Sequence, residues 1–76
     1  DAVVELEDGR WGAFEIKLGA NQIDAAAANL LHLAEEIGQE HPEKAPSLLC
    51  VVCGLSNAAY LRPDGVAVGP NTALKD

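Results

Sequence analysis

Glu15 and Lys17 stand two residues apart within Trp-Gly-Ala-Phe-Glu-Ile-Lys-Leu, residues 11–18 of the chain. Aromatic and β-branched residues recur in this stretch and turn residues flank it, so the pattern predicts a β-strand. Because side chains alternate between the two faces of a strand, the carboxylate and the ammonium share one face with Trp11 and Ala13. Such a pair is either a solvated ion pair, which contributes little to stability, or half of a metal-dependent site.

A predicted hairpin brings a second carboxylate to this pair. Residues 1–7 alternate in polarity, and Asp8-Gly9 marks a turn before the next strand. A two-residue loop at Asp8-Gly9 would place the apolar side chains of the first strand on the face of Glu15. A three-residue loop, with Gly9 in the left-handed region, instead pairs Val4 with Gly12.

We predict the register of the three-residue loop, Glu7-Asp8-Gly9. A slip of one residue would move an apolar set into water, whereas this register keeps the apolar side chains together. It also sets Asp1 directly opposite Glu15, on the face away from the apolar set. The predicted apolar face consists of Ala2, Val4, Leu6, Phe14, Ile16 and Leu18.

A helix is predicted after this hairpin. Residues 22–37 are rich in alanine and leucine and carry an apolar stripe at helical spacing. Asn21 is a good N-cap, and Gly38 suits the position that follows the last turn.

Two further strand segments are predicted in the C-terminal half. Residues 47–53 are almost continuously apolar, which is typical of a strand that is buried on both faces. Residues 59–62 and 65–68 flank a Pro-Asp turn and form a short hairpin. The whole order predicts an α/β (α+β) fold of β-hairpin, helix, buried strand and short β-hairpin, with the helix crossing over one face of the sheet.

The composition limits the classes of function. A chain of 76 residues forms one domain at most, and its first residue, Asp1, indicates an excerpt of a longer protein. The formal charge of −7, from 12 acidic and 5 basic residues, repels phosphate backbones and counts against nucleic-acid binding. No apolar stretch is long enough for a membrane span or a signal peptide, so we expect a cytoplasmic protein without a membrane partner.

Cys50 and Cys53 form a lone Cys-x-x-Cys. A zinc site needs four ligands, and His32 and His41 do not supply the missing pair at the spacing of a zinc finger. Three residues apart within a strand, the two cysteines face opposite sides of the sheet. We therefore predict two buried, reduced, structural thiols, which suit a cytoplasmic protein.

These elements together resemble a nuclease superfamily. Asp1, the Glu-Ile-Lys of residues 15–17 and the helix and strand that follow are similar to the PD-(D/E)XK superfamily, which has the restriction-endonuclease-like fold. Over the whole chain, three phrases resemble the C-terminal end of prokaryotic P-loop (AAA-type) ATPases, which end in a domain of unknown function similar to this fold. The phrases are Asp-Ala-Val-Val-Glu-Leu at 1–6, Trp-Gly-Ala-Phe-Glu-Ile-Lys-Leu-Gly at 11–19 and Asp-Gly-Val-Ala-Val at 64–68.

The resemblance implies one partial nuclease-like domain, residues 1–76, with a truncated restriction-endonuclease-like core. Its partner would be the N-terminal ATPase domain of the same parent chain. The family's first helix and first strand would lie upstream of Asp1, so catalysis by this chain alone is not expected. Without that strand an open sheet edge would be exposed, and copies of the chain would associate through it. The P-loop pattern Gly-x-x-x-x-Gly-Lys-Ser/Thr does not occur in these residues, so no ATP site is expected in them.

The resemblance also implies roles for particular residues. Asp1 and Glu15 would bind Mg²⁺, with Mn²⁺ as a substitute, and the backbone carbonyl of Ile16 would add a ligand. Such hard oxygen ligands suit Mg²⁺, which keeps several waters for use as a nucleophile. Lys17 would be the catalytic cation, orienting or deprotonating this water and offsetting charge on the phosphate. Gln22 matches a polar helix position that some members use, and simple solvation in the first turn is its alternative.

Three interpretations stay open on the sequence alone. The first is Mg²⁺-dependent phosphodiester hydrolysis on nucleic acid by the intact parent protein. The second is a non-catalytic regulatory or protein-interaction module of the ATPase, since a retained fold does not establish a retained activity. The third is a small structural domain in which the charges of the hairpin have no function.

Overall fold

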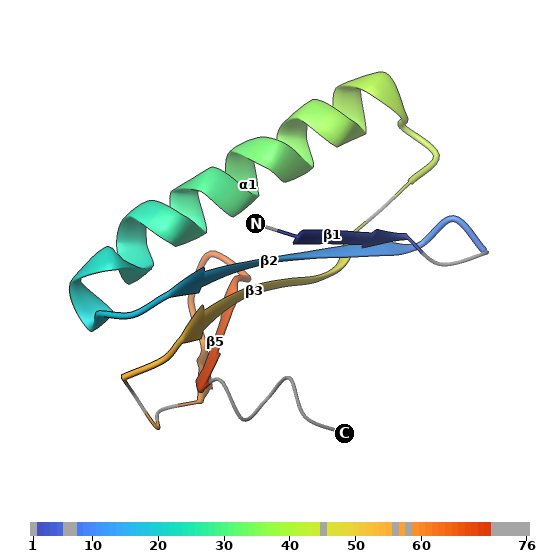
Figure 1. The fold of residues 1–76 in the computed structure, drawn as a ribbon. Coiled ribbons are helices and arrows are strands. Elements are labelled where there is room, and N and C mark those ends of the chain that lie inside the picture. Colours follow the sequence, from blue (N-terminus) through green and yellow to red (C-terminus); the bar gives the residue numbers. More distant parts are fainter. Residues whose placement is uncertain (1, 6–7, 45, 56, 58, 71–76) are drawn as a thin grey trace.

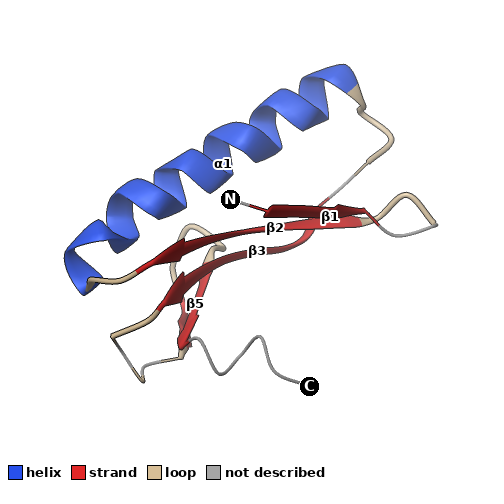
Figure 2. Cartoon of the chain, viewed as in Figure 1, coloured by secondary structure: helices blue, strands red, loops and turns tan. Residues whose placement is uncertain are grey.

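The computed structural model describes residues 2–5, 8–44, 46–55, 57 and 59–70 (Figure 1). They form a small α/β domain in which one long helix covers one face of a mixed, mostly parallel sheet (Figure 2). The elements in chain order are β1 (Ala2–Glu5), β2 (Trp11–Lys17), a 3₁₀ turn (Ala20–Gln22), α1 (Ile23–Glu40), β3 (Pro46–Cys53), β4 (Tyr60–Leu61) and β5 (Ala67–Pro70). The predicted order of hairpin, helix, strand and short hairpin is confirmed. The prediction that the strand is buried on both faces is wrong for the first half of β3, where Leu48 is 54% exposed.

The strands lie in the order β1-β2-β3-β5-β4. The β2–β3 and β3–β5 pairs are parallel, and the β1–β2 and β4–β5 pairs are antiparallel. Because α1 carries the chain back along the sheet, β3 can start level with β2 and run in the same direction. β3 therefore has a neighbour on both sides, and Val51, Val52 and Cys53 are buried within it.

The first hairpin has the predicted register. Val4 pairs with Gly12 and Ala2 with Phe14. Gly9 has a φ of 88°, in the left-handed region that glycine adopts at little cost. The prediction that Asp1 lies opposite Glu15 falls outside the described residues and stays a prediction.

The helix covers the face of the hairpin that was not predicted to be buried. Trp11, Ala13 and Glu15 are buried, whereas Ile16 is 55% exposed and Leu18 is 69% exposed. The prediction that the set with Ile16 and Leu18 forms the core face is therefore wrong. Trp11 carries the largest apolar surface of this strand, and its position on the other face favours burying that face instead.

The core lies between α1 and this face of the sheet. Ala26 and Ala27 are fully buried, and their small side chains let the helix approach the strands closely. The core cluster consists of Trp11, Ala13, Ile23, Ala26, Ala27, Leu30, Leu49, Val51, Cys53, Val66 and Val68. The prediction that Gly38 ends the helix is wrong, since α1 continues to Glu40 and the N–H of His41 still bonds to the carbonyl of Ile37.

The C-terminal hairpin is tied to the helix by a charged cluster. The Nη1 of Arg62 lies 2.7 Å from Asp24 of α1, and its Nε lies 3.1 Å from Asp64 in the turn. The backbone N–H of Val66 also donates to Asp64, and Gly65 completes the turn with a φ of 91°. These contacts fix the short β4–β5 pair against the end of the sheet that lies near the start of α1.

Candidate functional site

Glu15 is a buried carboxylate on the helix-covered face of β2. It is only 5% exposed and lies beside Val51 of β3 in the ladder, on the face that α1 covers. The Nζ of Lys17 lies 3.1 Å from its Oε1. The Lys17 side chain is 32% exposed, so it reaches from the buried carboxylate toward water. The structure confirms that the two side chains share a face, and it excludes the solvated ion pair that was the alternative interpretation.

The second oxygen of Glu15, Oε2, is buried and has no hydrogen-bond partner among the described residues. Leaving a buried polar atom unsatisfied costs about 1–3 kcal/mol, and more for a charged group. Buried polar groups in native proteins are nearly always hydrogen-bonded, so an unpaired one needs an explanation. A ligand that binds at this oxygen is one such explanation.

The backbone carbonyl of Ile16 lies at an accessible edge of the sheet. The carbonyl of Lys17 accepts a hydrogen bond from Gly54, which follows β3. Successive carbonyls of a strand point to opposite neighbours, so the carbonyl of Ile16 faces the β1 side. The described part of β1 begins at Ala2, opposite Phe14, and does not extend beside Ile16. The Ile16 side chain itself points to the sheet face away from α1.

The predicted site residues are thus brought together in part. Glu15 and Lys17 are in contact near the C-terminal end of β2, with Ile16 between them in the strand, and Gln22 is exposed in the 3₁₀ turn nearby in sequence. Asp1 lies outside the described residues. Within those residues no group of three or more His, Cys, Asp or Glu side chains is arranged to hold a metal ion.

Trp11 contributes a feature that the sequence did not reveal. Its indole Nε1 is buried and has no acceptor among the described residues. A pocket of about 250 Å³ lies over this side chain, lined by Val3, Glu5, Trp11, Ile37, Glu40, His41 and Lys44. The Lys44–Glu5 ion pair closes one side of it, and Lys44 lowers the pKa of Glu5 through this contact. Neither residue of the Glu15–Lys17 pair lines this pocket.

The two cysteines lie on opposite faces of the sheet, as predicted, but only Cys53 is buried. Both are free thiols, and Cys53 is buried in the core, where its Sγ lies 3.5 Å from the carbonyl of Leu18. Cys50 is half-buried, pairs in register with Phe14 and so faces the opposite side of the sheet. Burial raises the pKa of the Cys50 thiol, which makes it a poor nucleophile.

No family model, curated protein or solved structure matches the chain. None of the helices in the described residues combines the length and the apolarity that a bilayer crossing requires.

Proposed function

We propose that this chain is the metal-binding part of a nuclease-like domain, with a restriction-endonuclease-like core, from a longer prokaryotic P-loop ATPase. The observation that carries the proposal is the buried Oε2 of Glu15, beside Lys17, which has no hydrogen-bond partner among the described residues. The order of antiparallel hairpin, crossover helix and parallel strand also supports it, because this is the frame in which the Glu-x-Lys pair of that fold is expected.

Each residue of the pair has a role that its environment allows. Glu15 and the carbonyl of Ile16 supply oxygen ligands, and Asp1 would supply a second carboxylate. A bound Mg²⁺ would stabilise charge on a phosphoryl oxygen and lower the pKa of a bound water. Lys17 keeps its ammonium close to that position because Glu15 holds it, and a fixed cation offsets the negative charge that develops on the phosphate.

The acidic balance restricts the substrate. A chain with a formal charge of −7 offers little attraction to a long duplex backbone. The hydrolytic reaction is therefore assigned to the intact parent, where other parts of the protein would bind the nucleic acid. This chain would contribute the ligands and the cation.

Calorimetric titration of Mn²⁺ into the chain tests the proposal. We expect saturable binding that Glu15→Gln abolishes, because the amide removes the charge while keeping the size of the side chain. Glu35→Gln on the exposed face of α1 is the matched control and should bind as the parent chain does. Equal binding by both variants, or none in a folded sample, would contradict a metal role for Glu15.

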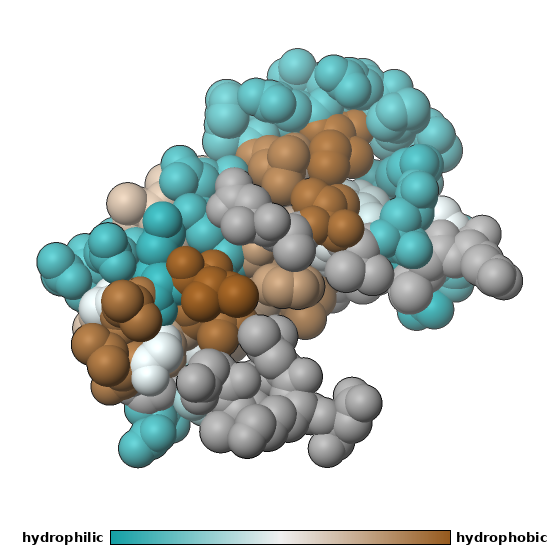
Figure 3. Space-filling model, viewed as in Figure 1, coloured by the Kyte–Doolittle hydropathy of each residue, from teal (hydrophilic) through white to brown (hydrophobic). Residues whose placement is uncertain are grey.

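A non-catalytic interaction module of the ATPase is the second candidate, and the sheet face away from α1 favours it. In α/β proteins a mostly parallel sheet is covered on both faces. Here hydrophobic side chains remain at the surface, and some of this hydrophobic surface is visible below the helix in Figure 3. The ladder places the exposed side chains of Ile16, Leu48 and Leu61 on this face. The open edge beside the end of β2 would also allow copies of the chain to associate.

The two candidates differ in one observable. A nuclease-like domain loses metal binding in Glu15→Gln and keeps its contacts to the ATPase domain. An interaction module without a metal site keeps those contacts in Glu15→Gln and loses them in Ile16→Lys, which places a charge on the exposed sheet face.

A further inference from the structure

The sheet has a notch beside the first half of β3. β2 pairs with β3 from Pro46 to Cys53, but β5 pairs only with the part from Cys50 to Cys53. The chain enters β5 from the turn at Gly65. This turn is not part of the sheet, so no strand in the described part of the chain follows β5 along residues 46–49. Residues 46–49 therefore have a strand neighbour on one side only, among the described residues.

The notch exposes backbone hydrogen-bonding groups. The N–H of Gly54 donates to the carbonyl of Lys17 at 2.8 Å, toward β2. The β2–β3 register shifts between Trp11 and Gly12, and regular pairing resumes at Leu48. Because N–H groups alternate along the regular part of the strand, that of Leu49 points away from β2, into the notch. No backbone hydrogen bond joins residues 46–49 to the turn at residues 62–66 in the described part of the chain. An added strand would give the N–H of Leu49 a partner.

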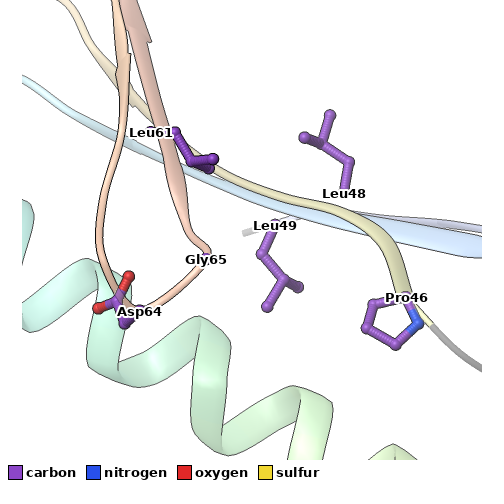
Figure 4. Close-up of a pocket in the computed structure, with 6 residues that line it drawn as sticks. All are labelled: Pro46, Leu48, Leu49, Leu61, Asp64 and Gly65. Carbon is purple, nitrogen blue, oxygen red and sulfur yellow. The ribbon is translucent and has the colours of Figure 1, made fainter.

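The side chains that line the notch are mainly apolar. They enclose a pocket of about 340 Å³, lined by Pro46, Leu48, Leu49, Leu61, Asp64 and Gly65 (Figure 4). Leu48 is 54% exposed and Leu61 is 71% exposed, and the ladder places both on the sheet face away from α1. Figure 4 shows Leu49 pointing to the opposite side of β3, the side on which Asp64 lies.

The charge of the notch is negative. Arg62 is shared between Asp24 and Asp64, so one guanidinium faces two carboxylates. The N–H of Val66 and the Arg62 guanidinium hold the pKa of Asp64 below its usual range, so this carboxylate stays charged at neutral pH. A cationic group on a ligand would complete the neutralisation of this cluster.

We propose that the notch binds an extended segment of a partner protein as an additional strand beside β3. The segment has alternating apolar and basic side chains. Its apolar side chains lie against Leu48 and Leu61, and a lysine or arginine between them faces Asp64. Backbone pairing provides the affinity and the alternate side chains provide the specificity, as in other cases of strand addition.

An extended segment suits the notch better than other occupants. A helix would leave the N–H of Leu49 without a partner, since its own backbone bonds are internal. A second copy of the chain would bring a further formal charge of −7 to a site that is already negative. The proposal does not depend on the metal site at Glu15.

The test uses ¹⁵N-labelled chain and the peptide Gly-Val-Lys-Val-Lys-Val-Gly. We expect saturable chemical-shift changes centred on the amides of residues 47–49, confirmed by fluorescence anisotropy of the labelled peptide. Leu48→Lys should weaken binding about tenfold or more, because it removes an apolar contact and repels the basic side chains. Leu55→Lys is the matched control, since Leu55 is 79% exposed and lies outside the pocket.

Two further measurements distinguish strand addition from electrostatic attraction alone. Methylation of the peptide amides that face β3 should abolish binding, and Asp64→Asn should weaken binding and reduce its dependence on salt. Equal binding of the methylated peptide, or of a peptide with the same residues in blocked order, would overturn the proposal. Shifts at residues 47–49 that depend on protein concentration without peptide would overturn it in favour of a second copy. Absence of shifts in a well-dispersed spectrum would overturn it outright.

Discussion

Replacing Glu15 by methionine tests whether this carboxylate is kept for function at the expense of stability. The side chain is buried on the helix-covered face of β2, and one of its oxygens has no partner among the described residues. Methionine has a similar length, carries no charge and packs well in irregular spaces. We therefore expect Glu15→Met to stabilise the fold.

The magnitude follows from two opposing terms. Removing an unsatisfied buried carboxylate oxygen gains about 1–3 kcal/mol, and replacing buried ionic groups by apolar ones often gains a similar amount. The loss of the Lys17 contact costs less, roughly 0–1 kcal/mol, because the ammonium reaches water. The net gain of about 1–2 kcal/mol corresponds to a rise in melting temperature of roughly 5–15 °C for a domain of this size.

Thermal and urea unfolding of the parent chain and two variants provide the assay. Glu15→Met should raise the melting temperature, and Lys17→Met should lower it, because the second change leaves the buried carboxylate without its one cation. A loss of about 1 kcal/mol or more in Glu15→Met would refute the reasoning. It would show that the carboxylate supports the fold and is not a functional group held at a cost.

The remaining predictions concern the frame around the site. Gly38→Ala should stabilise the chain by about 0.5–1 kcal/mol in urea unfolding, because Gly38 lies inside α1 with open space around an added Cβ. Gly65→Ala should destabilise it by about 1 kcal/mol in the same assay, because the φ of Gly65 is 91°. Lys44→Gln should make the free energy of unfolding depend less on pH in the acid range. The pKa of Glu5 is lowered from its ordinary 4.5 by Lys44, so this contact stabilises the fold above that pH and is lost as the pH falls through the folded-state pKa; an unchanged acid profile would contradict this assignment.

The register of the first hairpin could be predicted because turn chemistry and residue alternation agree. Asp8-Gly9 supplies the left-handed residue, and the pairing of Val4 with Gly12 follows from the loop length. The buried face could not be predicted the same way. Both faces of β2 carry apolar side chains, and the choice depends on where the alanine-rich helix packs, which is a tertiary contact and not a local pattern.

The burial of Glu15 is the second feature that the sequence does not contain. A charged residue in a strand is usually solvated, and the pattern alone favoured that interpretation. The end of α1 shows the same limit on a smaller scale. Gly38 is typical of a helix end, but the helix continues to Glu40, two residues before Pro42, whose ring prevents a further turn.

Paramagnetic broadening by Mn²⁺ tests the metal site at Glu15 most directly. In a ¹⁵N-labelled sample, substoichiometric Mn²⁺ should broaden the amides of Ile16 and Lys17 first. It should leave those of Glu35 and Glu36, on the exposed face of α1, sharp until much higher concentrations. Glu15→Gln should remove the selective broadening. Broadening that begins at the acidic face of α1, or that persists at Ile16 in the variant, would contradict a metal site built on Glu15.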